Sequence, residues 1–427
     1  MSEARVAENP PPPAEPTVGR GPSLLQPLRN RNYALLFTGQ LTSLIGDQLY
    51  VIALPFLILG HAGVRELGLV LMCFGLARII TVPIGGILAD RMDKSKLMLL
   101  TDVGRGFCVL AVAGLALTSL DSLVPLMALT AILGALEGLF LAPSYAILPE
   151  VVSEEQLPAA NSLNTALESA AGFIGPALAG VVVAVFTPGV ALAIDAATFL
   201  ISGLTLMALR RNLAREGASR TSEESSTEEP EASRMGFLRF LAVNRVVQLT
   251  LVIVLFSNLA FDAMADVALP VFSGDVLLRG AEGFGIMLSA FGAGALVGGL
   301  LADALFRLKR RALVALGLGV VQGVAITLVP IVGGLGGAAA VLFAAGVTMG
   351  VLNTFYITQL QQRVPAHLLG RTMGALNMCV FGSQPVSVLA AGLVLGTTGT
   401  APVFVAAGFL VIVGYLLASF NSEFRNL

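Results

Sequence analysis

The sequence has little charge for its length. Only 12% of its 427 residues are charged and 56% are hydrophobic, whereas an ordinary soluble domain has about 25% charged residues. A soluble fold could not keep so much apolar side chain away from water. Long apolar stretches recur between Leu35 and Phe420, and many have about 20 residues, the length a helix needs to cross the hydrocarbon core. We therefore expect most of the chain to lie in lipid.

Residues typical of enzymes and metal sites are scarce. The three cysteines, Cys73, Cys108 and Cys379, fall within apolar stretches and form no disulfide or metal-ligand pattern. His61 and His367 each fall alone in an expected loop, so neither supports a metal site or a catalytic triad. The phosphate-binding pattern G-x-x-x-x-G-K-[ST] does not occur. The sequence therefore predicts neither an enzyme nor a cofactor, a metal or an ATP requirement.

The distribution of positive charge predicts how the chain lies in the membrane. The net charge is −2 and no basic surface is evident, so nucleic acid is not expected as a partner. Arg65 and Arg279 fall in loops on one side and Arg78 falls within an apolar stretch, whereas the other Lys and Arg residues lie toward the opposite side. The positive-inside rule makes that side cytoplasmic. We expect a multi-pass protein of the plasma (inner) membrane with both termini in the cytoplasm.

Breaks between apolar runs predict an all-α membrane protein of about twelve spans in two pseudo-symmetric six-helix bundles. The expected spans are 35–60, 67–89, 97–119, 123–149, 160–186, 190–209, 242–272, 283–306, 312–332, 336–361, 367–396 and 401–420. The polar run from Thr221 to Glu231 is expected in a flexible linker. The expected domains are a disordered N-terminal tail (1–30), a first bundle (31–209), a cytoplasmic linker (210–240), a second bundle (241–421) and a short tail (422–427).

An internal repeat relates the two sets of spans. The run Gly85-Gly-Ile-Leu-Ala-Asp90 recurs as Gly298-Gly-Leu-Leu-Ala-Asp303, at an offset of 213 residues and at the end of the second span of each set. Parallel six-helix repeats are an established plan of secondary transporters, which bind substrate between the repeats near the midplane. The repeat therefore favours transport over a receptor or a scaffold.

The loop after the second span carries a family motif. Residues 86–96 read Gly-Ile-Leu-Ala-Asp-Arg-Met-Asp-Lys-Ser-Lys, which resembles the signature G-x-x-x-D-R-x-G-R-[RK] of the major facilitator superfamily. Asp93 replaces the usual second glycine. Such a loop can latch one conformation, because a small residue permits close helix packing and an acid at a helix end can bond a neighbouring helix. The candidate latch residues are Gly86, Asp90, Arg91, Lys94, Asp102, Arg105 and Asp303. An ordinary cytoplasmic turn, and a local Asp102–Arg105 ion pair, are the alternatives.

The fifth span carries a second motif. Gly172, Gly175, Pro176 and Gly180 resemble the Gly-Pro signature of the antiporter members of this superfamily. Proline removes a helix hydrogen bond and glycine allows close packing, so a bend beside a neighbouring helix is expected. The alternative is an ordinary kinked membrane helix. Residues 30–47 and 365–371 resemble the drug-exporting branch that includes macrolide and enterobactin-type exporters, and the motif in the fifth span favours efflux.

Charges inside the expected spans are candidates for energy coupling. Asp47, Arg78 and Glu137 fall near the middles of the first, second and fourth spans, where an isolated charge costs at least about 2.5 kcal/mol. We expect Arg78 to pair with one of the two acids and the other acid to bind a proton. The alternative is a purely structural ion pair. Glu168 and Asp195 are expected to be helix-packing charges.

Four further residues are candidates for the substrate cavity. Asp262 and Asp266 are four residues apart and hence on one helix face, where they could attract a cation or a basic drug. A hydrated outer vestibule is the alternative. Tyr50 and Tyr356 could offer aromatic contacts to an amphipathic substrate.

Together these features favour a proton-coupled exporter of a hydrophobic or amphipathic small molecule, such as a drug, an antibiotic or a siderophore-like compound. The expected partners are the small molecule, protons and the lipid bilayer, and the expected state is a monomer. An uptake symporter and a non-transporting membrane scaffold or receptor are the alternatives, with a lipid flippase as a third possibility.

Overall fold

The computed structural model describes residues 25–117, 122–217, 232–308 and 310–421. These residues are almost entirely helical and contain no strand. Twelve helices are long and apolar enough to cross a membrane, which confirms the expected number of spans. The first six are α1 Arg31–Leu59, α2 Val64–Arg91, α3 Lys94–Leu115, α4 Val124–Ala146, α6 Leu157–Val185 and α7 Pro188–Gly217.

The second six begin with a composite span. It consists of α9 Arg245–Asp262, the π-helical turn η3 Ala263–Ala268, α10 Leu269–Val271 and a second π-helical turn, η4 Phe272–Val276. The others are α11 Gly280–Phe306, α12 Arg311–Leu328, α13 Gly334–Arg363, α14 Ala366–Thr398 and α15 Thr400–Ser419. Shorter elements are η1 Gln26–Arg29, α5 Leu148–Val151, η2 Glu154–Gln156 and α8 Ala232–Val243.

Helical structure enters the predicted tail and linker. The turn η1 lies within the predicted N-terminal tail, and the Asn30 amide after it donates to the Val151 carbonyl at 2.9 Å. The helix α7 continues to Gly217, beyond the predicted end at residue 209, because its last residues are charged helix formers that need no lipid around them. The helix α8 occupies the other end of the linker. Residues 1–24, 218–231 and 422–427 of the predicted tails and linker lie outside the described residues.

The helices form two bundles of six. In the first bundle α1 packs on α6 and α7, α2 on α4, and α3 on α4 and α7, and in the second α11 packs on α13, α12 on α13 and α15, and α9 on α14 and α15. The repeat is visible in this packing. Gly138 of α4 lies against the carbonyl of Arg78, and Gly346 of α13 lies against the carbonyl of Phe291. Arg78 and Phe291 are again 213 residues apart, whereas Gly138 and Gly346 are 208 residues apart, so the offset of the repeated motif holds for the second helix of each bundle and is shorter for the fourth.

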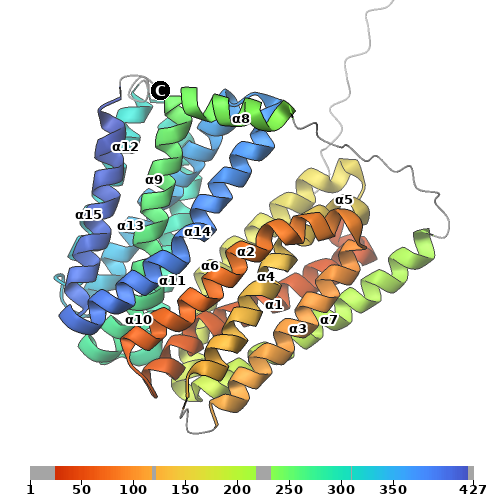
Figure 1. The fold of residues 1–427 in the computed structure, drawn as a ribbon, viewed down its shortest axis with the longest axis horizontal. Coiled ribbons are helices and arrows are strands. Elements are labelled where there is room, and N and C mark those ends of the chain that lie inside the picture. The colour runs from red at the N-terminus through yellow and green to blue at the C-terminus, as the bar shows by residue number, and fades with distance from the viewer. Residues whose placement is uncertain (1–24, 118–121, 218–231, 309, 422–427) are drawn as a thin grey trace, which may run out of the picture.

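The two bundles touch at one end and separate at the other (Figure 1). Contact between them is made chiefly by α6 with α11 and by α2 with α14. Gly285 of α11 lies against the Pro176 carbonyl, and Gly68 of α2 lies against the Val388 carbonyl. We call the end that holds these contacts the closed end. The opposite end, where α2 finishes at Arg91 and α14 begins, is the open end and lies at the top of Figure 1.

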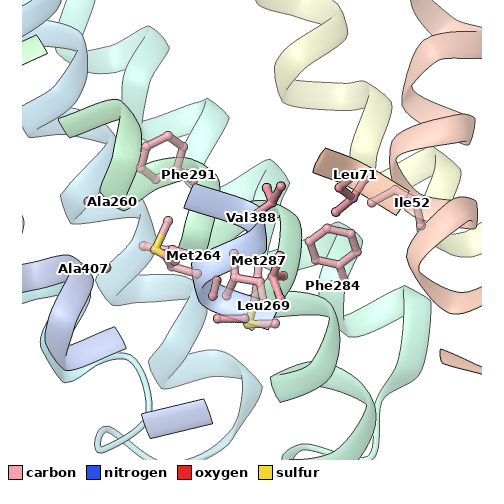
Figure 2. Close-up of a cluster of buried hydrophobic side chains, with 14 of the residues drawn as sticks. Ile52, Leu71, Ala260, Met264, Leu269, Phe284, Met287, Phe291, Val388 and Ala407 are labelled. Carbon is pink, nitrogen blue, oxygen red and sulfur yellow. The ribbon is translucent and has the colours of Figure 1, made fainter. Parts of the chain in front are cut away.

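The hydrophobic cores follow the same division. One large core spans both bundles and includes Ile52 and Leu71 of the first bundle with Phe284 and Val388 of the second. Figure 2 shows Phe284 at the boundary between the bundles, next to Leu71. Toward the open end each bundle has a separate small core of its own. The bundles therefore share their interior at the closed end alone.

Candidate functional site

A cavity of ≈ 180 Å³ lies between the bundles and contains most of the intramembrane charges. Its walls come from α1, α2, α3, α4 and α7 of the first bundle, together with η3, α11 and α14 of the second. Apolar and aromatic side chains such as Phe74 and Phe284 surround the charged ones. The charged residues in the wall are Asp47, Arg78, Arg105, Glu137, Asp195 and Asp266.

Arg78 and Glu137 form an ion pair across the first bundle. The Arg78 Nη2 atom lies 3.0 Å from the Glu137 Oε1 atom, with side chains 18% and 30% exposed. This contact confirms that Arg78 pairs with one of the two mid-span acids, and it selects Glu137. The guanidinium also lies 4.2 Å from the centre of the Phe381 ring of α14. Arg78 therefore contacts both bundles, through charge in one and through an aromatic face in the other.

Asp47 lies near Arg105 and Arg78, whose charges act on it within the site, but among the described residues it forms a salt bridge with neither. Within the described residues its side chain makes no hydrogen bond or ion pair. It lines the cavity described above and also a second cavity of ≈ 200 Å³, which extends toward the open end past Ser144 and Asn164. Arg105 and Glu137 line both cavities as well. Asp47 therefore lies where the central cavity meets a path toward the open end.

Asp102 and Arg105 form a local buried ion pair on α3. Asp102 also accepts a hydrogen bond of 2.6 Å from the Ser202 hydroxyl of α7. The Arg105 guanidinium lies over the rings of Phe140, at 4.2 Å, and Phe199, at 4.7 Å. From the sequence, this pair was grouped with Asp90 as a candidate latch, with a local ion pair as the alternative. Because α3 begins at Lys94, Arg105 lies about 16 Å along the helix, and the pair ties three helices of the first bundle together.

Loss of this pair should destabilise the first bundle. We expect Asp102→Asn to lower the free energy of unfolding by about 3–5 kcal/mol, because the change leaves the Arg105 charge buried without its partner. Thermal unfolding in detergent, followed with a thiol-reactive dye as Cys73, Cys108 and Cys379 become accessible, measures the change.

Lys94→Gln is the matched control for Asp102→Asn. It breaks the ion pair with Glu150, whose partners are 26% and 44% exposed, and such pairs contribute about 0–1 kcal/mol. Equal unfolding temperatures for the two variants would contradict a structural role for the buried pair.

Asp195 joins the site although the sequence suggested helix packing alone. Its side chain is fully buried on α7 and lines the central cavity. One carboxylate oxygen accepts a hydrogen bond of 3.4 Å from Thr198, while the other has no hydrogen-bond partner. Gly46 lies directly against Asp195 and Thr198. The feature of the sequence that could have indicated this position is Gly46, because a glycine permits close approach of two helices, here α1 and α7.

The acids of the seventh span are held by α14. The Ser383 hydroxyl donates to Asp262 at 2.6 Å, and the Gln384 amide donates to Asp266 at 3.0 Å. Asp266 and Gln384 line the central cavity, whereas Asp262 does not. Asp266 lies in the π-helical turn η3, and such turns are frequent at functional sites. Neither Ser383 nor Gln384 was singled out from the sequence, because no local pattern distinguishes these two polar residues.

The two tyrosines expected at the cavity lie in different places. Tyr50 of α1 lines the central cavity. Tyr356 does not, which corrects the sequence prediction. Its side chain is 4% exposed and lies in the core beside Phe355 and Tyr415, with ring centres 5.3 and 6.3 Å apart. The apolar pattern of α13 could not show which face meets α15, because that helix is apolar on all sides.

Apart from Asp102 and Arg105, the candidate latch residues lie at the open end, where the two bundles are separate. Asp90, Arg91 and Asp303 are exposed, and a side chain at Gly86 would meet open space. Within the described residues, no ion pair involves Asp90. A latch at these residues thus remains a prediction for a conformation in which the open end closes.

Next to these residues, Lys94 and Asp93 connect parts of the first bundle. Lys94 pairs with Glu150, and Asp93 Oδ2 lies 3.9 Å from Arg210 Nε. Partial burial raises the pKa of the Asp93 carboxyl. Hydrogen bonds from Ser95 and the Lys96 backbone, together with Arg210, outweigh that effect and hold the pKa below its usual range.

The Gly-Pro element forms part of the closed end. Gly180 lies against the Ala281 carbonyl and Gly172 against Gly292 of α11, while Gly175 accommodates the Gln48 side chain of α1. Toward the open end α6 and α11 diverge, and a cleft of ≈ 900 Å³ lies between α6, α11 and α13. Asn161, Thr165 and other small or polar residues line this cleft. The element thus lies where the helices change from close contact to an open cleft.

The known proteins that this chain resembles in sequence or fold are membrane transporters. The sequence model of the Major Facilitator Superfamily matches residues 36–388. The multidrug efflux pump Tap of Mycolicibacterium fortuitum is 25% identical over 96% of this chain and 97% of its own length. The enterobactin exporter EntS of Salmonella choleraesuis (strain SC-B67) is 27% identical over 92% of this chain and 93% of its own. A bacterial homologue of the iron transporter ferroportin, in an inward-facing state, has the same fold with a TM-score of 0.72, 16% identity and coverage of 93% and 99%.

Proposed function

Because the chain belongs to the major facilitator superfamily, we propose that it is a proton-coupled exporter of a hydrophobic or amphipathic small molecule. The observation that carries this proposal is the position of Asp47. Among the described residues this carboxylate forms no salt bridge, and it is located where the central cavity meets a path to the open end. A carboxylate exposed alternately to water on the two sides can carry a proton inward while substrate leaves.

The proposed orientation places the open end in the cytoplasm of a plasma (inner) membrane, with both termini on that side. The basic clusters of the sequence lie at this end. The structure then corresponds to a conformation that receives substrate from the cytoplasm. Substrate would enter through the cleft between α6 and α11, or between the bundles, and would leave after the closed end opens.

Export is favoured over uptake by the Gly-Pro element and by the relatives. The element packs against α11 at the closed end, where it would seal the outer side against leakage of protons. Two relatives are named as an efflux pump and an exporter. A substrate with positive charge suits the cavity, because Asp47, Asp195 and Asp266 form no salt bridge within the described residues.

Substrate-induced proton movement in vesicles that contain the purified protein tests the proposal. We expect addition of cationic dyes or macrolides to inside-out vesicles energised with an acidic interior to release protons from that interior. The same compounds should accumulate inside. Uptake symport predicts movement of substrate and proton in one direction, and a scaffold predicts no movement for any compound of the panel.

A further inference from the structure

The two bundles differ in charge balance at the open end. In the first bundle, basic residues lie beside acids, as in the Lys94–Glu150 and Arg210–Asp93 pairs. In the second bundle, the sequence from 232 to 421 has just one acid near this end, Asp303. The basic residues of the same stretch near this end are Arg234, Arg239, Arg245, Arg307, Lys309, Arg310, Arg311, Arg363 and Arg371. The sequence of the second bundle therefore has more basic than acidic residues near this end.

Part of this charge lines a pocket. The helix α8 lies across the open end of the second bundle (Figure 1), and its residues Phe237 and Phe240 pack on a small core formed by the ends of α9, α13 and α14. A pocket of ≈ 620 Å³ lies between α8, the start of α9 and the end of α13. Arg239 of α8 and Arg363 of α13 line it, and none of its lining residues is acidic.

The two arginines are available to a ligand. Neither forms an ion pair within the described residues. The Nε atom of Arg363 donates to the side-chain amide oxygen (Oε1) of Gln359 at 3.2 Å, and Gln359 is 2% exposed. This bond holds the stem of Arg363 and leaves its two terminal nitrogens free to bind. A guanidinium fixed in this manner suits an oxyanion, which it can bind through two parallel hydrogen bonds.

The remaining walls are apolar. Phe240, Val243 and Val246 line the same pocket, and Val243 is 75% exposed although it is aliphatic. An exposed apolar residue beside two arginines, at the depth where membrane helices end, fits the boundary between lipid headgroups and acyl chains. We propose that this pocket binds the phosphate headgroup of an anionic phospholipid, with Arg239 and Arg363 on the phosphate and the apolar wall against the upper acyl chain.

A free phosphate ion has the same charged chemistry, but it would leave the apolar wall exposed. The lipid is therefore the occupant that accounts for both the two arginines and the apolar wall of the pocket. Two basic residues near the membrane surface favour an anionic lipid over a zwitterionic one by about 30-fold. The site does not depend on the transported compound, so its test is separate from that of export.

Fluorescence quenching can measure the preference directly. The chain has no tryptophan, so Val243→Trp gives a single reporter in the pocket wall. The full-length variant is reconstituted in mixtures of phosphatidylcholine and phosphatidylglycerol, with bromine atoms on the acyl chains of one lipid or the other. We expect quenching to show an exchange constant that favours phosphatidylglycerol by about 30-fold, and Arg239→Gln with Arg363→Gln to reduce it to about one.

The control removes two charges from the same face outside the pocket. Arg307→Gln with Arg310→Gln in the reporter background should keep the preference, because neither residue lines the pocket. Inorganic phosphate should not relieve the quenching by brominated phosphatidylglycerol. Equal quenching by the two lipids would overturn the proposal. An equal loss in both double variants would also overturn it, since it would show a diffuse charge effect, and relief by inorganic phosphate would assign the pocket to the free ion.

Discussion

Asp47→Asn should abolish substrate-induced proton release while the protein still folds and binds substrate. Asparagine keeps the shape of the side chain but cannot exchange a proton. Asp47 forms no salt bridge within the described residues, so removal of its charge breaks no ion pair, whereas Glu137→Gln would leave Arg78 without its salt-bridge partner. We therefore expect a complete loss of proton movement, with substrate binding measured in detergent changed by less than about tenfold.

Asp275→Asn is the control for this experiment. Asp275 is exposed near the closed end and lines neither of the two cavities that contain Asp47. It should leave proton release intact. If Asp47→Asn released protons as well as the unmodified protein does, coupling would have to be assigned to another acid. Glu137, Asp195 and Asp266 are the candidates in the same cavity.

Gly285→Val should destabilise the conformation seen here, in which the bundles touch at the closed end. A Cβ atom at this position would overlap the carbonyl of Pro176 and crowd Gly180, both of which are backbone rather than flexible side chain. Overpacking of this kind costs about 1–3 kcal/mol, which shifts the balance between the two conformations about 5–150-fold. Labelling of a Thr165→Cys reporter in the open cleft, in a background without native cysteines, should slow by up to that factor, because the labelling rate follows the fraction of molecules with the cleft open.

Gly317→Val is the matched control on α12. A Cβ atom there meets no atom within 4 Å, so the same substitution adds bulk without a clash. We expect the labelling rate of the reporter to remain unchanged. A comparable effect of the two valines would show that helix flexibility, and not the contact between α6 and α11, controls access to the cleft.

The spans could be predicted because the bilayer fixes their length. An apolar run long enough to cross must be helical throughout, so the positions of Arg78 and Glu137 near mid-span, and their need for partners, followed from counting along the chain. The repeat at residues 85–90 and 298–303 gave the two bundles in the same manner. These properties depend on one helix at a time.

The rotation of each helix about its axis could not be predicted. Apolar side chains surround these helices on nearly every side, because lipid and protein core are both apolar, so the sequence does not distinguish the face that packs from the face that meets lipid. The contact of Gly46 with Asp195 determines that α1 and α7 approach closely, and the face of α13 that meets α15 determines that Tyr356 is buried. The sequence therefore did not predict that Asp195 lines the cavity and wrongly predicted that Tyr356 does. Both outcomes depend on how pairs of helices face each other.

Beside the side-chain core that the two bundles share at the closed end, several helix contacts there bring backbone against backbone. Gly68, Gly180, Gly285 and Gly292 have no side chains that must change rotamer when the helices part. At these four positions, separation of the helices breaks weak contacts but does not require a side chain to leave a groove. These glycine contacts should therefore add little to the energy barrier when one bundle rotates relative to the other.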